Sequence, residues 1–292
     1  MPSSYLKSFQ LRQYECDANG HLNNANYVRF LHEATLEAMQ GVRPRSGTGT
    51  LSDLAWYASE LFVDYIQPAR YGDTLRVQAQ VIEQQKMRVL WGYEFQKDGA
   101  LEPIARAQVR YGLVDPVGGR WSAIPEEMKE AFEAAESRLH PVESIQYPAT
   151  PPPPPGAFTG NWRVGWRDIS QDQTLQIASY LDYLLDFVLQ AAAACGWTFQ
   201  HTLEQGLALV VRRKWLKIFE PVKYGDELRL STWLSPMKRA SVTRHIIIER
   251  AADGVKIGEA HTLWVCVDIK NGRPVRIPAS WEDDFKPQIS VE

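Results

Sequence analysis

The chain alternates between two hydrophobic periods, one typical of helices and one typical of strands. Apolar or small residues recur at three- and four-residue spacing in one early segment: Val28, Leu31, Ala34, Thr35 and Ala38. This spacing predicts an amphipathic helix from Asn24 to about Gln40. A second and more apolar helix is predicted from Leu175 to about Cys195, and we expect protein to bury it on most sides.

Between and after these helices lie segments rich in β-branched and aromatic residues, bounded by turn residues. They predict strands at 9–14, 56–66, 74–84, 87–97 and 104–115, and again at 162–166, 208–218, 227–234, 241–250 and 258–268. Asp98-Gly99 and Asp253-Gly254 are typical of hairpin turns. One long helix followed by an antiparallel meander, found twice, predicts an α+β fold.

The two halves are copies of each other. The segment PARYGDTLRV contains Gly72, and PVKYGDELRL contains Gly225, which lies 153 positions later. The same offset relates further pairs: Pro68 and Pro221, Tyr27 and Tyr180, Asp115 and Asp268, and Pro125 and Pro278. A 153-residue period is too long for a solenoid repeat and indicates duplication of a whole domain.

A proline-rich segment marks the junction. Pro151 to Pro155 are consecutive prolines, which favour extended polyproline II and a stiff spacer. We therefore expect an N-terminal domain at 1–146, a linker at 147–157 and a C-terminal domain at 158–292. The tandem copies predict an internal pseudo-dimer, with further homodimer formation as an open alternative.

The composition argues against several classes of protein. The 292 residues have a net charge of −3, so no basic field indicates nucleic-acid binding. Three widely spaced cysteines, Cys16, Cys195 and Cys266, form neither a metal nor a disulfide pattern, and a cytoplasmic protein is expected. Asp182 and Asp186 interrupt the most apolar segment, which argues against a membrane span.

The most chemically informative segment is DANGHLNNANY. It places a carboxylate at Asp17, an amide at Asn19 and an imidazole at His21, just before the first predicted helix. Asn23 and Asn24 are typical helix-capping residues. A helix N-terminus carries unpaired N–H groups and a partial positive charge, which stabilise developing negative charge.

The second copy lacks this chemistry. Adding 153 to the three positions gives Ser170, Asp172 and Thr174, so the imidazole is lost and the acid moves by two residues. Packing positions such as Tyr27 and Tyr180 are kept in both copies. The asymmetry favours a chemical role for the first copy and a structural role for the second.

The segment GHLNNANY followed by PARYGD resembles the hotdog-fold thioesterases of the 4-hydroxybenzoyl-CoA thioesterase type. The doubled chain and the DANGH spacing are similar to those of the tandem acyl-ACP thioesterases of plants and bacteria. The resemblance implies two hotdog domains, each an antiparallel sheet around one helix, and a role in lipid metabolism. It implies Asp17, Asn19 and His21 as the catalytic group. Plant members have a further Glu before the turn, where this chain has Pro68 to Tyr71.

The sequence therefore predicts hydrolysis of acyl-CoA or acyl-ACP without a metal or cofactor, with Asp17 as nucleophile or general base. We expect Asn23, Asn24, Tyr27 and Glu60 to contact substrate, although capping, packing or a solvated strand charge also explain them. Alternation along the strand predicted at 56–66 places Glu60 on the same face as Trp56. Two alternatives are a non-catalytic acyl-carrier binding or sensing module and a hotdog enoyl hydratase or dehydratase. The hydratase motif places its His five residues after the Asp, whereas His21 follows Asp17 by four.

Overall fold

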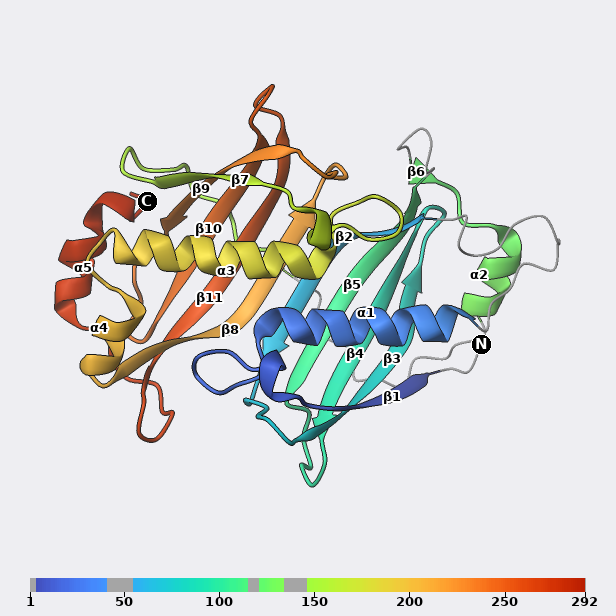
Figure 1. Ribbon diagram of the computed structural model, residues 1–292, viewed down its shortest axis with the longest axis horizontal. Helices are drawn as coiled ribbons and strands as arrows, with labels where there is room; N and C mark the ends of the chain where they lie inside the picture. Colours follow the sequence, from blue (N-terminus) through green and yellow to red (C-terminus); the bar gives the residue numbers. More distant parts are fainter. Residues whose placement is uncertain (1–3, 41–54, 115–120, 134–145, 292) are drawn as a thin grey trace. The chain divides into compact units, whose positions relative to one another are not determined.

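The computed structural model describes residues 4–40, 55–114, 121–133 and 146–291. The chain divides into two compact units, Met1–Ile145 and Gln146–Glu292 (Figure 1). The proline-rich segment that we expected as a separate linker groups with the second unit. Lys217 lies over the ring of Tyr147, 3.9 Å from its centre, and the Thr150 hydroxyl lies 3.5 Å from Nε2 of His261.

The first unit is a five-stranded antiparallel sheet with one long helix on one face (Figure 1). The strand order is β1-β3-β4-β5-β2, and a short strand β6 pairs with β5. The elements are β1 (Tyr5–Gln10), a 3-10 turn (Gln13–Glu15), α1 (Asn24–Gln40), β2 (Ala55–Tyr65), β3 (Thr74–Gln84), β4 (Arg88–Lys97), β5 (Ala105–Val114), β6 (Trp121–Ser122) and α2 (Glu126–Glu133).

The second unit repeats this arrangement with the order β8-β11-β10-β9-β7 and the long helix α3. Its elements are β7 (Phe158–Arg163), a 3-10 turn (Trp166–Asp168), α3 (Ile177–Ala193), α4 (Phe199–Glu204), β8 (Leu207–Ile218), β9 (Glu227–Leu234), β10 (Ser241–Arg250), β11 (Lys256–Asp268), α5 (Ala279–Phe285) and a 3-10 turn (Lys286–Gln288). In each unit an antiparallel sheet packs around one long helix, so the predicted α+β class is confirmed.

The hydrophobic pattern explains the core of the first unit. Val28, Leu31 and Ala34 of α1 are fully buried, as the three- and four-residue spacing predicts. Thr35 is buried among them, and its hydroxyl donates to the carbonyl oxygen of Leu31 at 2.8 Å. Because this polar group is satisfied within the helix, it fits an otherwise apolar face.

The second helix is buried on most sides, as expected. Nine of its residues are buried, and the exposed Asp186, Leu189 and Gln190 lie on one narrow stripe. One face of α3 packs on the sheet and the other carries the acidic residues. Among the described residues, no helix is both long and apolar enough to cross a membrane.

The first strand of each unit begins earlier than predicted. The structure places β1 at Tyr5–Gln10 rather than 9–14, and β7 at Phe158–Arg163 rather than 162–166. Both predictions included residues that form the following 3-10 turn. The end of the strand predicted at 104–115 includes Asp115, which lies outside the described residues. The turns at Gly99 and Gly254 are confirmed, with φ of 80° and 72°.

Candidate active site

The loop Asp17–His21 lies immediately before α1 and is closed by its own backbone. The N–H of Asp17 donates to the carbonyl oxygen of His21 at 2.8 Å, and the N–H of Gly20 donates to that of Asp17 at 2.9 Å. Gly20 has a φ of 70°, a left-handed conformation that costs glycine little. These backbone bonds therefore fix the Cα positions of the three predicted catalytic residues.

The half-buried carboxylate of Asp17 lies across this loop. Its Oδ1 accepts the backbone N–H of Asn19 at 2.9 Å and that of His21 at 3.3 Å. These bonds fix the orientation of the carboxylate and also tie the loop together. The side chain of Asn19 is exposed. The structure thus brings Asp17 and His21 together, and it joins Asn19 to Asp17 through its backbone.

His21 is half-buried, and the charges of Arg70 and Asp17 both act on its imidazole. Burial lowers the pKa of His21, and the charge of Arg70 lowers it further, while the carboxylate of Asp17 opposes both. At neutral pH the imidazole is therefore mainly neutral and able to accept a proton. Sequence reasoning missed Arg70 as a neighbour of this loop, and the PARYGD turn that carries it was the available signal.

A second loop holds Arg70 beside the first. The N–H of Leu22 donates to the carbonyl oxygen of Ala69 at 2.8 Å, and the N–H of Arg70 donates to Oδ2 of Asp73 at 2.8 Å. Burial alone would raise the pKa of Asp73, but its 2.9 Å ion pair with Lys97 and the Arg70 N–H lower it overall. The ionised Asp73 thus holds the turn that carries Arg70.

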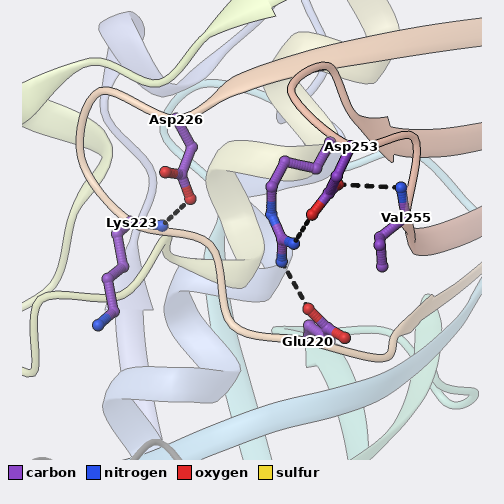
Figure 2. Close-up of polar contacts among 6 residues, drawn as sticks. Glu220, Lys223, Asp226, Asp253 and Val255 are labelled. Carbon is purple, nitrogen blue, oxygen red and sulfur yellow. Dashed lines mark hydrogen bonds and ion pairs between the residues drawn. The ribbon is translucent and has the colours of Figure 1, made fainter.

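The second unit contains the same turn (Figure 2). The N–H of Lys223 donates to Oδ2 of Asp226 at 2.9 Å, as Arg70 does to Asp73. The surrounding ion pairs differ, because Arg250 contacts Asp253 and Glu220. The backbone function of the aspartate in the YGD motif is therefore common to both copies.

The start of α1 supplies a backbone donor. Oδ1 of Asn23 accepts the N–H of Ala25 at 2.8 Å, which is the predicted capping contact. The carbonyl oxygen of Asn24 accepts the hydroxyl of Tyr65 at 3.2 Å. Within the described part of the chain, no acceptor is recorded for the N–H of Asn24. This donor lies at the positive end of the helix dipole.

The two remaining predicted substrate contacts lie in other environments. Tyr27 is 3% exposed and packs edge-on against Tyr65 and Phe95, which supports its packing role. Glu60 forms an ion pair with Arg110 at 3.3 Å. A β-bulge between Ala58 and Glu60 shifts the register.

This bulge overturns one expectation drawn from alternation along the strand. Trp56 pairs with Leu113, and Glu60 pairs with Arg110, three residues away on β5. Residues an odd number apart on a regular strand face opposite sides. Glu60 therefore lies on the opposite face from Trp56, although the sequence suggested one shared face.

The equivalent loop of the second unit keeps the backbone and changes the chemistry. The N–H of Ser170 donates to the carbonyl oxygen of Thr174 at 2.9 Å, which repeats the bond between Asp17 and His21. Asp172 ties this loop by accepting the N–H of Thr174 at 3.1 Å. Gln173, at the position of Gly20, has a φ of 64°.

Both halves match families of thioester-cleaving enzymes. Residues 11–132 match the thioesterase-like superfamily, and residues 155–285 match the acyl-ACP thioesterase N-terminal domain. Together the two matches cover most of the chain.

Individual relatives agree with these families. The acyl-CoA thioesterase YbgC of Haemophilus influenzae is 27% identical over 128 residues, which are 43% of this chain and 93% of that protein. The chloroplastic palmitoyl-acyl carrier protein thioesterase of Gossypium hirsutum is 23% identical over 136 residues. That match spans 44% of this chain and only 33% of the Gossypium protein.

Two solved structures show the same doubled fold. The 12:0-ACP thioesterase from Umbellularia californica has a TM-score of 0.68 at 17% identity, covering 90% of this chain and 94% of that one. An acyl-ACP thioesterase from Bacteroides thetaiotaomicron has a TM-score of 0.67 at 15% identity, covering 90% and 98%. With the family matches in both halves, these findings identify the chain as a tandem hotdog protein of the thioesterase superfamily.

Proposed function

We propose that this protein hydrolyses acyl-CoA or acyl-ACP thioesters to a carboxylic acid and a thiol, using the Asp17–His21 loop of its first unit. The main support is the contrast between two loops with one backbone. The first carries a carboxylate at Asp17 beside a neutral imidazole at His21, and the second carries Ser170 and Thr174 at these two positions. The names of the relatives support CoA and ACP as the carriers.

Asp17 acts on the thioester carbonyl either directly or through water. Direct attack forms an acyl anhydride and releases the thiolate, and water then hydrolyses the anhydride to regenerate Asp17. As a general base, Asp17 instead takes a proton from the water that attacks the carbonyl. Oδ1 already accepts two N–H groups, so we assign the reacting role to Oδ2.

The other groups have supporting roles in this proposal. The N–H of Asn24 polarises the thioester carbonyl and stabilises its oxyanion, aided by the helix dipole. The neutral imidazole of His21 orients water or takes up the proton released in hydrolysis. Asn19 fixes Asp17 through its backbone, and Asn23 fixes the helix start.

Free-thiol release from a panel of acyl-CoA and acyl-ACP substrates tests the proposal. The panel runs from short to long and aromatic acyl groups, and the matched variant is Asp17→Asn. An amide oxygen still accepts the two backbone N–H groups, so the loop is kept while the charge is lost. We expect a loss on the order of a hundredfold or more, the scale of a removed acid–base group.

Each outcome has a defined meaning. Turnover of CoA esters that disappears in Asp17→Asn supports both the reaction and the residue. Turnover restricted to acyl-ACP identifies the carrier. No turnover with either carrier refutes the hydrolase and favours the binding module. Undiminished turnover by Asp17→Asn keeps the reaction but removes Asp17 from it.

A further inference from the structure

A row of polar residues crosses the helix-facing side of the sheet in the second unit. Arg244 on β10 is directly opposite Thr262 on β11, and Thr262 is directly opposite Lys214 on β8. Directly opposite residues of antiparallel strands share a face. Arg244 contacts Gln288, which in turn donates to the carbonyl oxygen of Ala191 in α3, so this face is the one beneath the helix.

All three residues of the row are buried. Lys214 is 4% exposed, Thr262 is 1% exposed and Arg244 is 5% exposed. The hydroxyl oxygen of Thr262 is buried and has no hydrogen-bond partner among the described residues. Buried polar groups normally have such partners, because an unpaired one loses its hydration without compensation.

The two cations of the row have no counter-charge among the described residues. Among the residues that the structure describes, no carboxylate forms an ion pair with Lys214 or Arg244. The recorded hydrogen bonds of Arg244 go from one guanidinium nitrogen to neutral oxygens of Gln288 at 3.2 Å and Thr232 at 3.5 Å. Burial lowers the pKa of Lys214 to about 8, so most of its ammonium stays charged at neutral pH.

The first unit shows that the fold itself does not require this row. The residues 153 positions earlier are Leu61, Val109 and Trp91, which are apolar and at most 2% exposed. The same three sites under the helix of the first unit hold uncharged side chains. Two buried cations and an unpaired hydroxyl in the second unit therefore need another explanation.

We propose that Lys214, Thr262 and Arg244 form an anion site inside the second unit that binds the carboxylate of an aliphatic acid. A carboxylate accepts hydrogen bonds from an ammonium, a hydroxyl and a guanidinium, and its charge offsets the two cations. The buried neighbours on the same face, Leu216 and Ile246, favour an alkyl chain attached to that group. The proposal concerns binding alone, so it does not rest on the proposed hydrolysis.

The test is heat unfolding of the full-length protein with dodecanoate, compared with dodecanol of the same chain length. A ligand that binds only the folded state raises the unfolding midpoint in a saturable manner. The matched variants are Lys214→Leu and Thr262→Val, which introduce the first unit's residues. Lys214→Leu removes a buried charge, so we expect the ligand-free variant to fold and to unfold at a higher temperature than the wild type.

We expect dodecanoate to raise the midpoint of the wild type more than dodecanol does. We expect the dodecanoate dissociation constant to rise at least tenfold in Lys214→Leu and severalfold in Thr262→Val. Equal effects of dodecanoate and dodecanol, equal dodecanoate affinity in wild type and Lys214→Leu, or no saturable dodecanoate effect would each overturn the proposal. Thiol release does not enter this measurement, so failure of the proposed hydrolysis is distinguished from failure of the anion site.

Discussion

A double substitution that introduces two residues of the second unit's loop into the first unit's loop separates the chemical role of Asp17 from its role in holding the loop. The double substitution Asp17→Ser with Asn19→Asp reproduces the pattern of Ser170 and Asp172. In the second unit that pattern supports the same backbone, with the carboxylate of Asp172 accepting the N–H of Thr174 at 3.1 Å. We therefore expect the double variant to fold with its loop intact.

The hydrogen bonds of the Asp17 carboxylate set the expected changes in stability. Asp17→Ala removes bonds of 2.9 and 3.3 Å to a carboxylate. At a half-exposed site their loss should lower the free energy of unfolding by roughly 1–2 kcal/mol. For a unit of this size that is a fall of about 3–7 °C in the unfolding midpoint. The double variant retains a carboxylate that ties the loop, and we expect its midpoint to change by less than about 3 °C.

Activity should not follow stability. Asp17→Ala and the double variant should both lose on the order of a hundredfold or more in kcat/KM for thiol release, because each lacks the carboxylate at position 17. Calorimetry and thiol release on the same preparations measure both quantities. A double variant that retained activity within a few-fold of wild type would refute the assignment of chemistry to Asp17.

Three further substitutions test other parts of the argument. Arg70→Gln removes a cation beside His21, so an NMR titration should show a higher His21 pKa than in wild type, and an unchanged or lower value would contradict the electrostatic reasoning. Burial lowers the pKa of both His245 and His261 to about 4, so the unfolded state binds more protons as the pH falls below about 6.5, and stability is lost towards pH 4. Urea unfolding at pH 7 and 4.5 should show that His261→Gln loses less free energy of unfolding between these pH values than the wild type does. An equal loss would argue against a contribution of His261 to the pH dependence. Gln173→Gly should relieve about 1–2 kcal/mol of strain from the left-handed conformation of residue 173. Glycine also raises the entropy of the unfolded chain, which costs about 0.4–1 kcal/mol of stability. Calorimetry should therefore show a protein that is more stable than wild type, and a less stable one would contradict the strain.

The sequence predicted regular elements well where periodicity was strong. The predicted bounds of α1 match the structure, as do those of β3, β9 and β10. The first strands were placed several residues late because aromatic residues of the following 3-10 turns extend the apolar pattern. Alternation alone does not reveal a bulge, and for that reason Glu60 was assigned to the face of Trp56.

The candidate site was predictable in part. The segment from Asp17 to His21 is local, so its spacing directly indicates which groups meet. Arg70 is brought to the loop by contacts distant in sequence, such as the hydrogen bond between Leu22 and Ala69 across 47 positions, which no local pattern reveals. The anion row in the second unit likewise depends on cross-strand register, which joins Lys214 to Arg244 through Thr262.

The two loops show why comparing the copies was informative. Each loop is held by backbone bonds to its own second loop, from Leu22 to Ala69 and from Leu175 to Val222, both at 2.8 Å. Because these bonds do not involve side chains, the loop conformation persists whatever residues occupy positions 17, 19 and 21. It persists even where Gln173 must adopt a left-handed φ that glycine would adopt more easily. The scaffold therefore does not require an acid at position 17 or an imidazole at position 21, and the presence of both groups at these positions in only one copy is better explained by chemistry than by folding.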